Sequence, residues 1–428
     1  MSQFSFQDGV LHAERTSLSR IAAEHGTPTY VYSKAGLLGN LHAYADACRG
    51  RDALVCYAMK ANSNLAILDL LAREGAGFDI VSGGELLRVL AAGGDPRKVI
   101  FSGVGKSENE MRLALQHDIL CFNVESIPEL HRLNQVAGEV GKQARVSLRV
   151  NPNVDAKTHP YISTGLKANK FGVAHSEAMD TYRAAAALPH LDVVGVDCHI
   201  GSQLLDDAPL LEALDKMIAL IDALRVEGIE VHHLDLGGGI GIAYGQPDED
   251  GEPVPVADYV GRALARIDAW RAEKYDGRPI KVIFEPGRSI VGDTGVLLTT
   301  VEYLKPGEEK NFCIVDAAMN DLMRPTLYGA WMDVQAVNKS AGDVHTYDVV
   351  GPVCESGDWL AKDRALAVQP GDVLAIMQAG AYGFAMGSNY NTRGRAAEIM
   401  VDGEQVHVVR RRENPAELFA LESRLNVS

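Results

Sequence analysis

Long hydrophobic runs and clustered cysteines are both missing from this sequence. Nowhere do about 18 uncharged apolar residues, roughly the length of a membrane-spanning helix, stand together. The first residues, MSQFSFQDGV, lack the basic segment and apolar core of an export signal. The cysteines are scattered singly, with no CxxC pair, at Cys48, Cys56, Cys121, Cys198, Cys313 and Cys354. We therefore expect a reduced, cytoplasmic protein without a membrane span or a bound metal.

Positive charge is the other scarce feature. The chain has 41 basic and 57 acidic side chains, which give a formal net charge of −16. Such a charge repels nucleic acids and anionic membrane surfaces, so we expect neither as a partner. With 428 residues, 46% of them hydrophobic, the chain has an ordinary globular composition and exceeds the usual size of one hydrophobic core. The length therefore predicts two domains.

Eight short apolar runs with strand-like composition lie between about residues 54 and 286: LVCYAM, FDIVS, VIFSG, LCFNV, RVSLRV, VVGVDCHI, HHLDLGG and KVIFEP. Most are separated by stretches such as NLAILDLLAREGAG, in which apolar residues recur at helical spacing before a glycine. Eight β-α repeats predict a closed (β/α)₈ barrel, although a doubly wound open sheet can be written from the same pattern.

The position of the polar residues favours the barrel. They fall at or just past the carboxyl ends of the strands, which a barrel gathers around one mouth: Lys60, Asp79, Ser82, His199, Gly237 to Gly239 and Glu285. After Glu285 the sequence changes to strands separated by turns such as KPGEEK and QPGD, which predict a second, mainly β domain. We expect the barrel over residues 31–286 and the β domain over 1–30 and 287–428, unless residues 1–30 cover the base of the barrel. The long polar connection from Asn151 to Gly172 is expected to be functional.

Lys60 stands in CYAMKANSN, where an apolar run ends in a single cation. An amine at the barrel mouth can form a Schiff base once desolvation or a positive neighbour favours its neutral form. A solvated lysine at a strand end is the simpler interpretation. Three consecutive glycines in HHLDLGGGIG would let backbone N–H groups approach an anion, or form only a structural turn. The match to a dinucleotide fingerprint, GxGxxG, is loose.

Two further segments carry candidate polar groups. In VIFEPGRSIV, Glu285 could hold a heterocyclic nitrogen protonated and Arg288 could grip a carboxylate or phosphate, unless the two form an ordinary ion pair. In DCHIGSQ, His199 could be a base, a stacking partner or a satisfied core histidine. Ser202 could donate to an anion or cap the next helix.

The β domain offers candidates that mean little one by one. NDLMRPTLYGA contains Arg324 and Tyr328, GPVCESGDWL contains Cys354 and Glu355, and QAGAYGFAMGSNYN contains Tyr382. A buried structural cysteine is more common than a catalytic one. These residues become evidence for a functional site only because they occur together with the barrel motifs.

Taken in order, YAMKAN, FDIVSGGE, HIGSQ, LGGGIG, EPGR, MRPTLYGA, GPVCES and GAYG resemble the successive motifs of diaminopimelate decarboxylases, which are fold-type III, alanine-racemase-like enzymes. The resemblance covers nearly the whole chain and implies the cofactor pyridoxal 5'-phosphate, bound to Lys60 as a Schiff base. His199 would stack on the pyridine ring and Glu285 would pair with its nitrogen. The other implied cofactor contacts are Asp79, Ser202, Gly237, Gly238, Gly239, Gly287, Arg288 and Tyr382.

The resemblance also implies the substrate contacts and the assembly. Arg288, Arg324, Tyr328 and Tyr382 would contact the substrate, and Glu355 would bind its distal ammonium. Cys354 would reprotonate the α-carbon from the other subunit of a homodimer with shared active sites. The implied reaction is decarboxylation of meso-2,6-diaminopimelate to L-lysine and CO₂, the last step of lysine biosynthesis.

Three alternatives stay open on the sequence. The first is a related decarboxylase that acts on ornithine, arginine or carboxynorspermidine. Ornithine and arginine decarboxylases show aspartate after the cysteine, whereas Glu355 and Ser356 follow Cys354 here and favour diaminopimelate. A non-catalytic barrel that only binds the cofactor would not need both Glu285 as support for an electron sink and Cys354 as a proton donor. The interpretation as a nicotinamide-binding protein depends on the LGGGIG segment alone, which matches the dinucleotide fingerprint only loosely.

Overall fold

The computed structural model describes residues 3–155, 169–246 and 251–425. Most of the connection between Asn151 and Gly172, which the sequence marks as functional, therefore lies outside the described residues. The chain forms two compact units. The barrel unit comprises residues 39–242 and 251–290, and the sheet unit comprises residues 1–38, 243–250 and 291–428.

The barrel unit is a closed ring of eight parallel strands, which confirms the predicted (β/α)₈ fold. Neighbouring strands pair in sequence order, and the last pairs with the first through Ile283 and Leu54. The strands are β5 (Ala53–Ala58), β6 (Gly77–Ile80), β7 (Val99–Phe101), β8 (Cys121–Val124), β9 (Ala144–Asn151), β11 (Leu191–Asp197), β12 (His233–Asp235) and β13 (Lys281–Phe284). A short strand, β10 (Val173–Ala174), pairs with the end of β9. Nearly all of these strand residues are buried, as expected for strands enclosed by helices.

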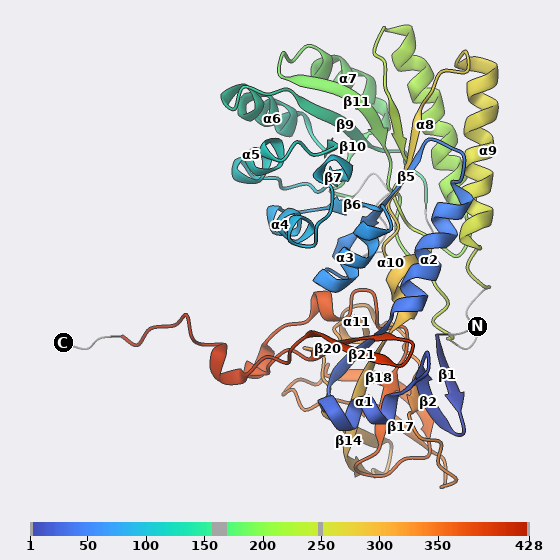
Figure 1. The fold of residues 1–428 in the computed structure, drawn as a ribbon, viewed down its shortest axis with the longest axis vertical. Coiled ribbons are helices and arrows are strands. Elements are labelled where there is room, and N and C mark those ends of the chain that lie inside the picture. Colours follow the sequence, from blue (N-terminus) through green and yellow to red (C-terminus); the bar gives the residue numbers. More distant parts are fainter. Residues whose placement is uncertain (1–2, 156–168, 247–250, 426–428) are drawn as a thin grey trace. The chain divides into compact units, whose positions relative to one another are not determined.

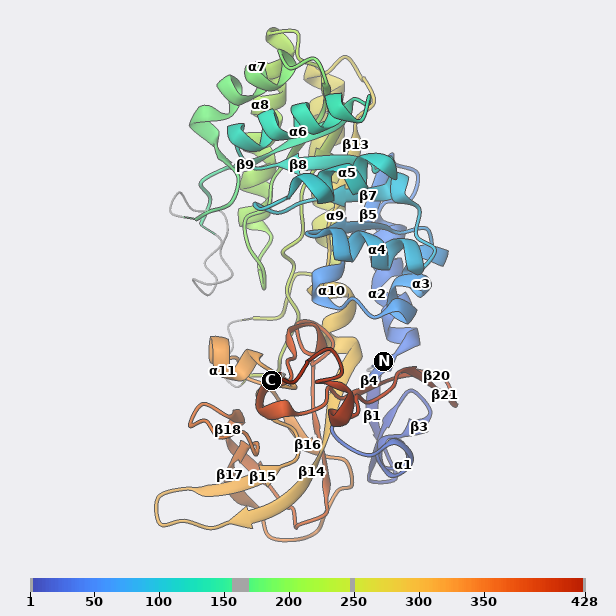
Figure 2. The same ribbon diagram turned by 90° about the vertical axis from the view of Figure 1, so that its left-hand side faces the viewer.

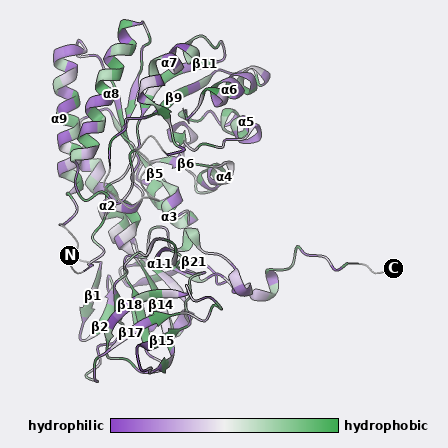
Figure 3. Cartoon of the chain, turned by 180° about the vertical axis from the view of Figure 1, so that it is seen from behind, coloured by the Kyte–Doolittle hydropathy of each residue, from purple (hydrophilic) through white to green (hydrophobic). Residues whose placement is uncertain are grey.

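Helices surround these strands (Figure 1). Several begin at a side chain that caps the free backbone N–H groups: Asn64, Ser82 and Ser126 accept such bonds, and Ser107 forms a capping box with Glu110. Each helix carries both hydrophobic and hydrophilic residues, so that one face can pack on the strands (Figure 3). The helices are α2 (Lys34–Ala47), α3 (Leu65–Arg73), α4 (Gly83–Ala91), α5 (Glu108–Gln116), α6 (Ile127–Glu139), α7 (Ala178–Ala186), α8 (Ala208–Val226), α9 (Val256–Lys274) and α10 (Arg288–Val291).

The sheet unit is mainly β-structure, as predicted. Its largest sheet has the strand order β18-β17-β15-β14-β4-β20-β21, with β19 paired to β14 and β16 paired to β19. Figure 2 shows β14, β15 and β17 side by side in this unit. The strands of this sheet are β4 (Thr29–Ser33), β14 (Gly295–Lys305), β15 (Asn311–Val315), β16 (Val334–Ala336), β17 (His345–Val350), β18 (Trp359–Leu366), β19 (Val373–Ile376), β20 (Ala397–Asp402) and β21 (Gln405–Arg410). The unit also contains β1 (Phe4–Gln7), β2 (Val10–Ala13), β3 (Thr16–Ser17), α1 (Leu18–His25) and α11 (Arg324–Tyr328).

The position of the first 30 residues, which the sequence left open, follows from the pairing of β4. This strand lies between β14 and β20, antiparallel to the first and parallel to the second. Val31 belongs to a core cluster with Leu18, Val296 and Ile399. The amino-terminal segment is therefore an integral part of the sheet unit. Among the described residues, no helix combines the length and the apolar character that crossing a bilayer requires.

Candidate active site

Lys60 lies directly past β5, in the short 3₁₀ helix Met59–Ala61. Its Nζ donates to Oδ2 of Asp79 on the neighbouring strand β6, at 2.6 Å. The Asp79 side chain is fully buried, whereas the Lys60 side chain is 36% exposed. The amine is therefore held at the barrel mouth by a buried carboxylate but stays accessible, which the interpretation as a solvated surface lysine does not explain.

His199 follows β11 and is fixed through its ring. The backbone N–H of Gly238 donates to His199 Nδ1 at 3.2 Å, so the ring carries its proton on Nε2. Burial, followed by the positive charges of Arg149 and Lys60, lowers the pKa of His199 well below its usual value. The imidazole is consequently neutral at physiological pH and presents an oriented, uncharged ring.

The glycine turn after β12 needs its glycines for packing. A Cβ at Gly238 would lie 2.3 Å from the carbonyl oxygen of Glu285, and Gly239 has a φ of +132°, which other residues rarely adopt. Two N–H groups of the turn bind side chains: Gly237 donates to Asp235 Oδ1 at 2.9 Å, and Gly238 donates to His199. The turn thus positions barrel side chains, a role that the sequence pattern did not reveal.

Arg288 and Ser202 meet at the same mouth. The Arg288 Nη2 donates to Ser202 Oγ at 3.2 Å, and the Arg288 residue is only 5% exposed. Ser202 therefore does not cap α8, whose N-cap position is Asp207. Gly287 precedes Arg288 and is buried, with space for a Cβ limited by the Ala58 carbonyl oxygen at 3.1 Å. The Arg288 guanidinium and the Ser202 hydroxyl, next to the closely packed backbone at Gly287, suit the binding of a phosphate or carboxylate.

Three buried carboxyl groups come together inside the barrel, and the sequence singled out only Glu285. Carboxylate oxygens of Asp197, Asp235 and Glu285 all lie within 4.8 Å of one another. Burial, followed by the charge of Asp235, raises the pKa of Glu285 and of Asp197 well above the usual values. Burial also raises the pKa of Asp235 to about 6. The closed barrel therefore shifts all three acids toward their protonated forms.

Asp197 and Asp235 could have been found from the sequence. Each is the last residue of its strand, in VVGVDCHI and HHLDLGG, two positions before the candidate residues His199 and Gly237. In Glu285, the Oε1 atom is buried and makes no hydrogen bond to any described residue. A ring N–H would satisfy this atom, so the site fits a protonated pyridine.

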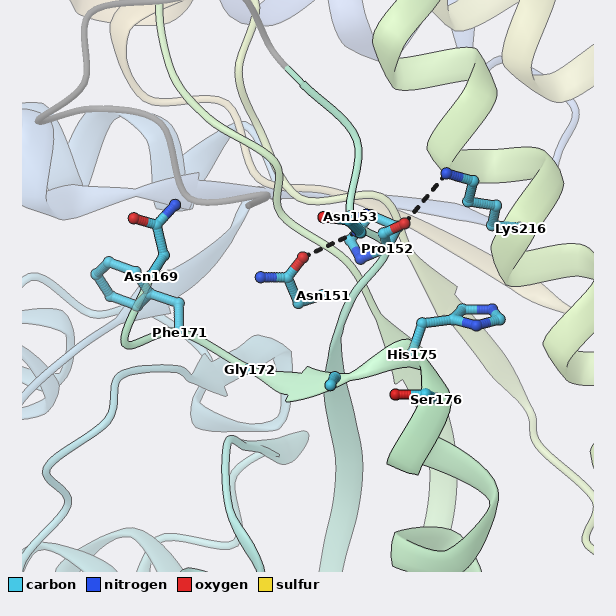
Figure 4. A pocket seen from close by; sticks show the side chains of 10 residues that line it. Asn151, Pro152, Asn153, Asn169, Phe171, Gly172, His175, Ser176 and Lys216 are labelled. Carbon is cyan, nitrogen blue, oxygen red and sulfur yellow. Dashed lines mark hydrogen bonds between the residues drawn. The ribbon is translucent and has the colours of Figure 1, made fainter. Parts of the chain in front are cut away.

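A cavity of about 590 Å³ opens where β9 ends, at the same end of the barrel. Figure 4 shows Lys216 of α8 reaching toward the loop after β9, where its Nζ donates to the Pro152 carbonyl oxygen at 3.1 Å. Phe171 also lines this cavity, and the buried guanidinium of Arg149 lies over the Phe171 ring at 4.8 Å. The cavity therefore offers room for a small molecule at the carboxyl end of β9.

The remaining predicted residues lie in the sheet unit. Arg324 begins α11, is 7% exposed and lies over the Tyr244 ring at 4.6 Å. Tyr328 ends the same helix and is partly exposed. Cys354 and Glu355 are both exposed in the loop between β17 and β18, whereas the other five cysteines are buried. Tyr382 is partly buried and has a φ of +55°.

Comparison with known proteins agrees with this geometry. A family model described as pyridoxal-dependent decarboxylase, pyridoxal binding domain, matches residues 37–292. The diaminopimelate decarboxylase of Pseudomonas aeruginosa is 60% identical over 425 residues, which are 99% of this chain and 100% of that protein. That of Vibrio cholerae is 56% identical over 424 residues, which are 99% of each.

Solved structures give the same result. The crystal structure of diaminopimelate decarboxylase from Helicobacter pylori complexed with L-lysine has a TM-score of 0.88 and 44% identity, covering 94% of this chain and 98% of that chain. The corresponding structure from M. jannaschii in co-complex with L-lysine has a TM-score of 0.90 and 37% identity, covering 98% and 97%. The motif resemblance is therefore confirmed, and the chain belongs to the diaminopimelate decarboxylase family of pyridoxal-dependent decarboxylases.

Proposed function

We propose that this chain uses pyridoxal 5'-phosphate to decarboxylate meso-2,6-diaminopimelate, producing L-lysine and CO₂. The observation that carries the proposal is the barrel mouth, where the accessible amine of Lys60 and the buried acid Glu285 occur with an oriented, neutral His199. Family membership supports the reaction class, and the relatives solved with L-lysine support an amino-acid ligand.

Each barrel residue would have a distinct part in holding the cofactor. Lys60 would bind it covalently, and Asp79, which accepts a hydrogen bond from the Lys60 amine, would hold that amine in place. His199 would lie against the ring, held by the N–H of Gly238, while Gly237 packs against the imidazole. Ser202, Gly239 and the backbone of Gly287 and Arg288 would hold the phosphate, with Tyr382 as a further contact. When bound, pyridoxal phosphate supplies the ring that accepts the electron pair left on the α-carbon as CO₂ departs.

Glu285 would set the direction of the chemistry. Its carboxylate, which lies beside those of Asp197 and Asp235, would accept a hydrogen bond from the protonated ring nitrogen. A racemase of the same barrel class is thought to place an arginine at this position, which weakens electron withdrawal. The acid at position 285 therefore favours decarboxylation over racemisation.

The residues of the sheet unit would select the substrate. Diaminopimelate has two carboxylates, which Arg288 and Arg324 would bind, and a distal ammonium, which Glu355 would bind. Tyr328 and Tyr382 would line the site. Cys354 would donate the proton that replaces CO₂ on the α-carbon, which completes the formation of lysine.

We further propose that the enzyme is a cytoplasmic homodimer in which each site takes Cys354 and Glu355 from the partner subunit. The exposure of both side chains in a single chain supports this arrangement, because a proton donor needs a water-poor site. The six free thiols are typical of a reducing compartment.

Complementation tests the shared site. The variants Lys60→Ala and Cys354→Ala should each be inactive alone, and Lys60→Ala should also lose the visible absorbance of the bound cofactor. Mixed in equal amounts under conditions that exchange subunits, they should regain about a quarter of the wild-type activity, because half of the dimers then contain one intact site. No recovery despite demonstrated subunit exchange would show that both residues come from the same chain.

Substrate comparison tests the reaction itself. The cofactor-loaded protein is incubated with meso-diaminopimelate, ornithine or arginine, and the amine product and CO₂ are measured. Preferential formation of lysine supports the proposal. Consumption of ornithine or arginine instead would leave the cofactor assignment intact and overturn the roles given to Arg324 and Glu355.

A further inference from the structure

The loop that carries Cys354 and Glu355 is held by two consecutive residues from a distant part of the chain. The Tyr390 hydroxyl donates to Glu355 Oε1 at 2.5 Å. The side-chain oxygen of Asn391 accepts a hydrogen bond from the backbone N–H of Cys354 at 3.2 Å. Neighbouring residues of one segment thus bind neighbouring residues of the other, so the register between the two segments is fixed.

The segment that supplies these contacts has an unusual backbone. Asn391 and Thr392 have φ values of +57° and +56°. This conformation is uncommon for asparagine and unfavourable for a β-branched residue such as threonine. Strained residues of this kind persist where the surrounding structure holds them, and they occur often at functional sites.

The support comes from the interior of the sheet unit. Arg393 Nε donates to Asn320 Oδ1 at 2.9 Å, and its Nη2 donates to the Asp316 carbonyl oxygen at 2.5 Å. Ser388 N–H donates to the Asn320 carbonyl oxygen at 2.9 Å. Asn320 is 1% exposed, so residues 388–393 are anchored on buried structure even though Tyr390 itself is 45% exposed.

We propose that Tyr390 is a positioning residue for substrate specificity, which fixes the Glu355 carboxylate so that it can receive the distal ammonium of the substrate. This inference rests on the proposed function, in which Glu355 binds that ammonium. The phenol occupies one carboxylate oxygen with a short, charge-assisted hydrogen bond and leaves the other oxygen for the ligand. Because the phenol is neutral, the negative charge of Glu355 is oriented but not compensated. Asn391 fixes the backbone of Cys354 in the same way.

The test is a double-mutant cycle on the cofactor-loaded enzyme. Tyr390→Phe removes only the hydroxyl, and Glu355→Gln removes the charge; the double variant combines them. Tyr390→Phe should raise KM for meso-diaminopimelate about tenfold while changing kcat less than about twofold, since the lost contact orients a binding group. In the Glu355→Gln background the same change should alter KM less than about twofold. Tyr303→Phe, at a 66% exposed tyrosine of the same unit, is the matched control.

Two results would overturn the proposal. One is a KM for Tyr390→Phe that matches the control. The other is an effect of Tyr390→Phe that is equally large with and without Glu355. A spectrophotometric titration of tyrosine ionisation detects the contact between Tyr390 and Glu355 without measuring enzyme activity. The hydrogen bond to Glu355 raises the pKa of Tyr390, so one tyrosine should ionise at lower pH in Glu355→Gln than in the wild type.

The titration also separates the two proposals. If the enzyme does not turn over diaminopimelate, the proposed function fails, and the titration still decides whether Tyr390 holds Glu355. A titration curve that Glu355→Gln leaves unchanged would refute the positioning role, whatever the substrate is.

Discussion

Replacing Asp235 by asparagine should stabilise the cofactor-free protein at neutral pH. Asp235 is fully buried and belongs to the cluster with Asp197 and Glu285. Asparagine has nearly the same shape, and its side-chain oxygen can still accept the hydrogen bond from the Gly237 N–H. The substitution therefore removes one ionisable group from the barrel interior and leaves the packing in place.

The magnitude follows from the pKa of Asp235, which burial raises from 3.8 to about 6. Because the folded state holds the proton more tightly than the unfolded state, the wild-type protein loses stability as the pH rises through this window. The full loss is about 3 kcal/mol, of which about 1.3 kcal/mol falls between pH 5 and pH 7. The Asp235→Asn variant does not lose stability in this way. Its unfolding free energy should therefore exceed that of the wild type least at low pH and most above pH 6.

Urea unfolding at several values between pH 5 and pH 8 measures the effect. The difference in unfolding free energy between Asp235→Asn and the wild type should grow with pH by the amount given above. Asp192→Asn, at an exposed aspartate near the start of β11, is the control and should show no such trend. Parallel stability curves for Asp235→Asn and the wild type would show that Asp235 is ionised at little cost, which would refute the reasoning about the cluster.

Two further substitutions test the assignments in the barrel and sheet units. Arg324→Ala should lower kcat/KM for diaminopimelate by about 100-fold, as expected for a lost charge-assisted contact, and a loss no larger than that of the exposed Arg411→Ala would exclude it as a carboxylate anchor. Gly238→Ala would bring a Cβ to 2.3 Å from the Glu285 carbonyl oxygen, so cofactor affinity should fall and stability should drop by about 1–3 kcal/mol in thermal unfolding. Gly261→Ala, where no atom outside the surrounding helix backbone lies within 4 Å of the added Cβ, should be tolerated. Equal behaviour of the two variants would contradict the packing argument.

The sequence alone determined the architecture of the barrel, because its strands are buried on both sides and read as separate apolar runs. Each of the eight predicted runs coincides with one strand of the closed ring. The motif residues stand at strand ends, and parallel strands in a ring bring those ends together. The sequence alone therefore predicts that Lys60, His199 and Glu285 belong to one site.

Tertiary structure alone decided which neighbours these residues have. Asp79 holds Lys60, and the Gly238 N–H holds His199, across separate strands and loops. The pairing of β4 between β14 and β20 likewise depends on residues far apart in sequence, as strand pairing is not encoded locally.

The same holds for the charge state of Glu285 and the position of Glu355. A glutamate at a strand end has an ordinary pKa unless burial and other acids raise it, and Asp197 and Asp235 meet Glu285 only in the closed barrel. Tyr390 lies 35 residues from Glu355, and a strained turn anchored by Arg393 brings the two together. Strand periodicity is local and can be read from the sequence, whereas hydrogen bonds between distant side chains exist only once the chain has folded.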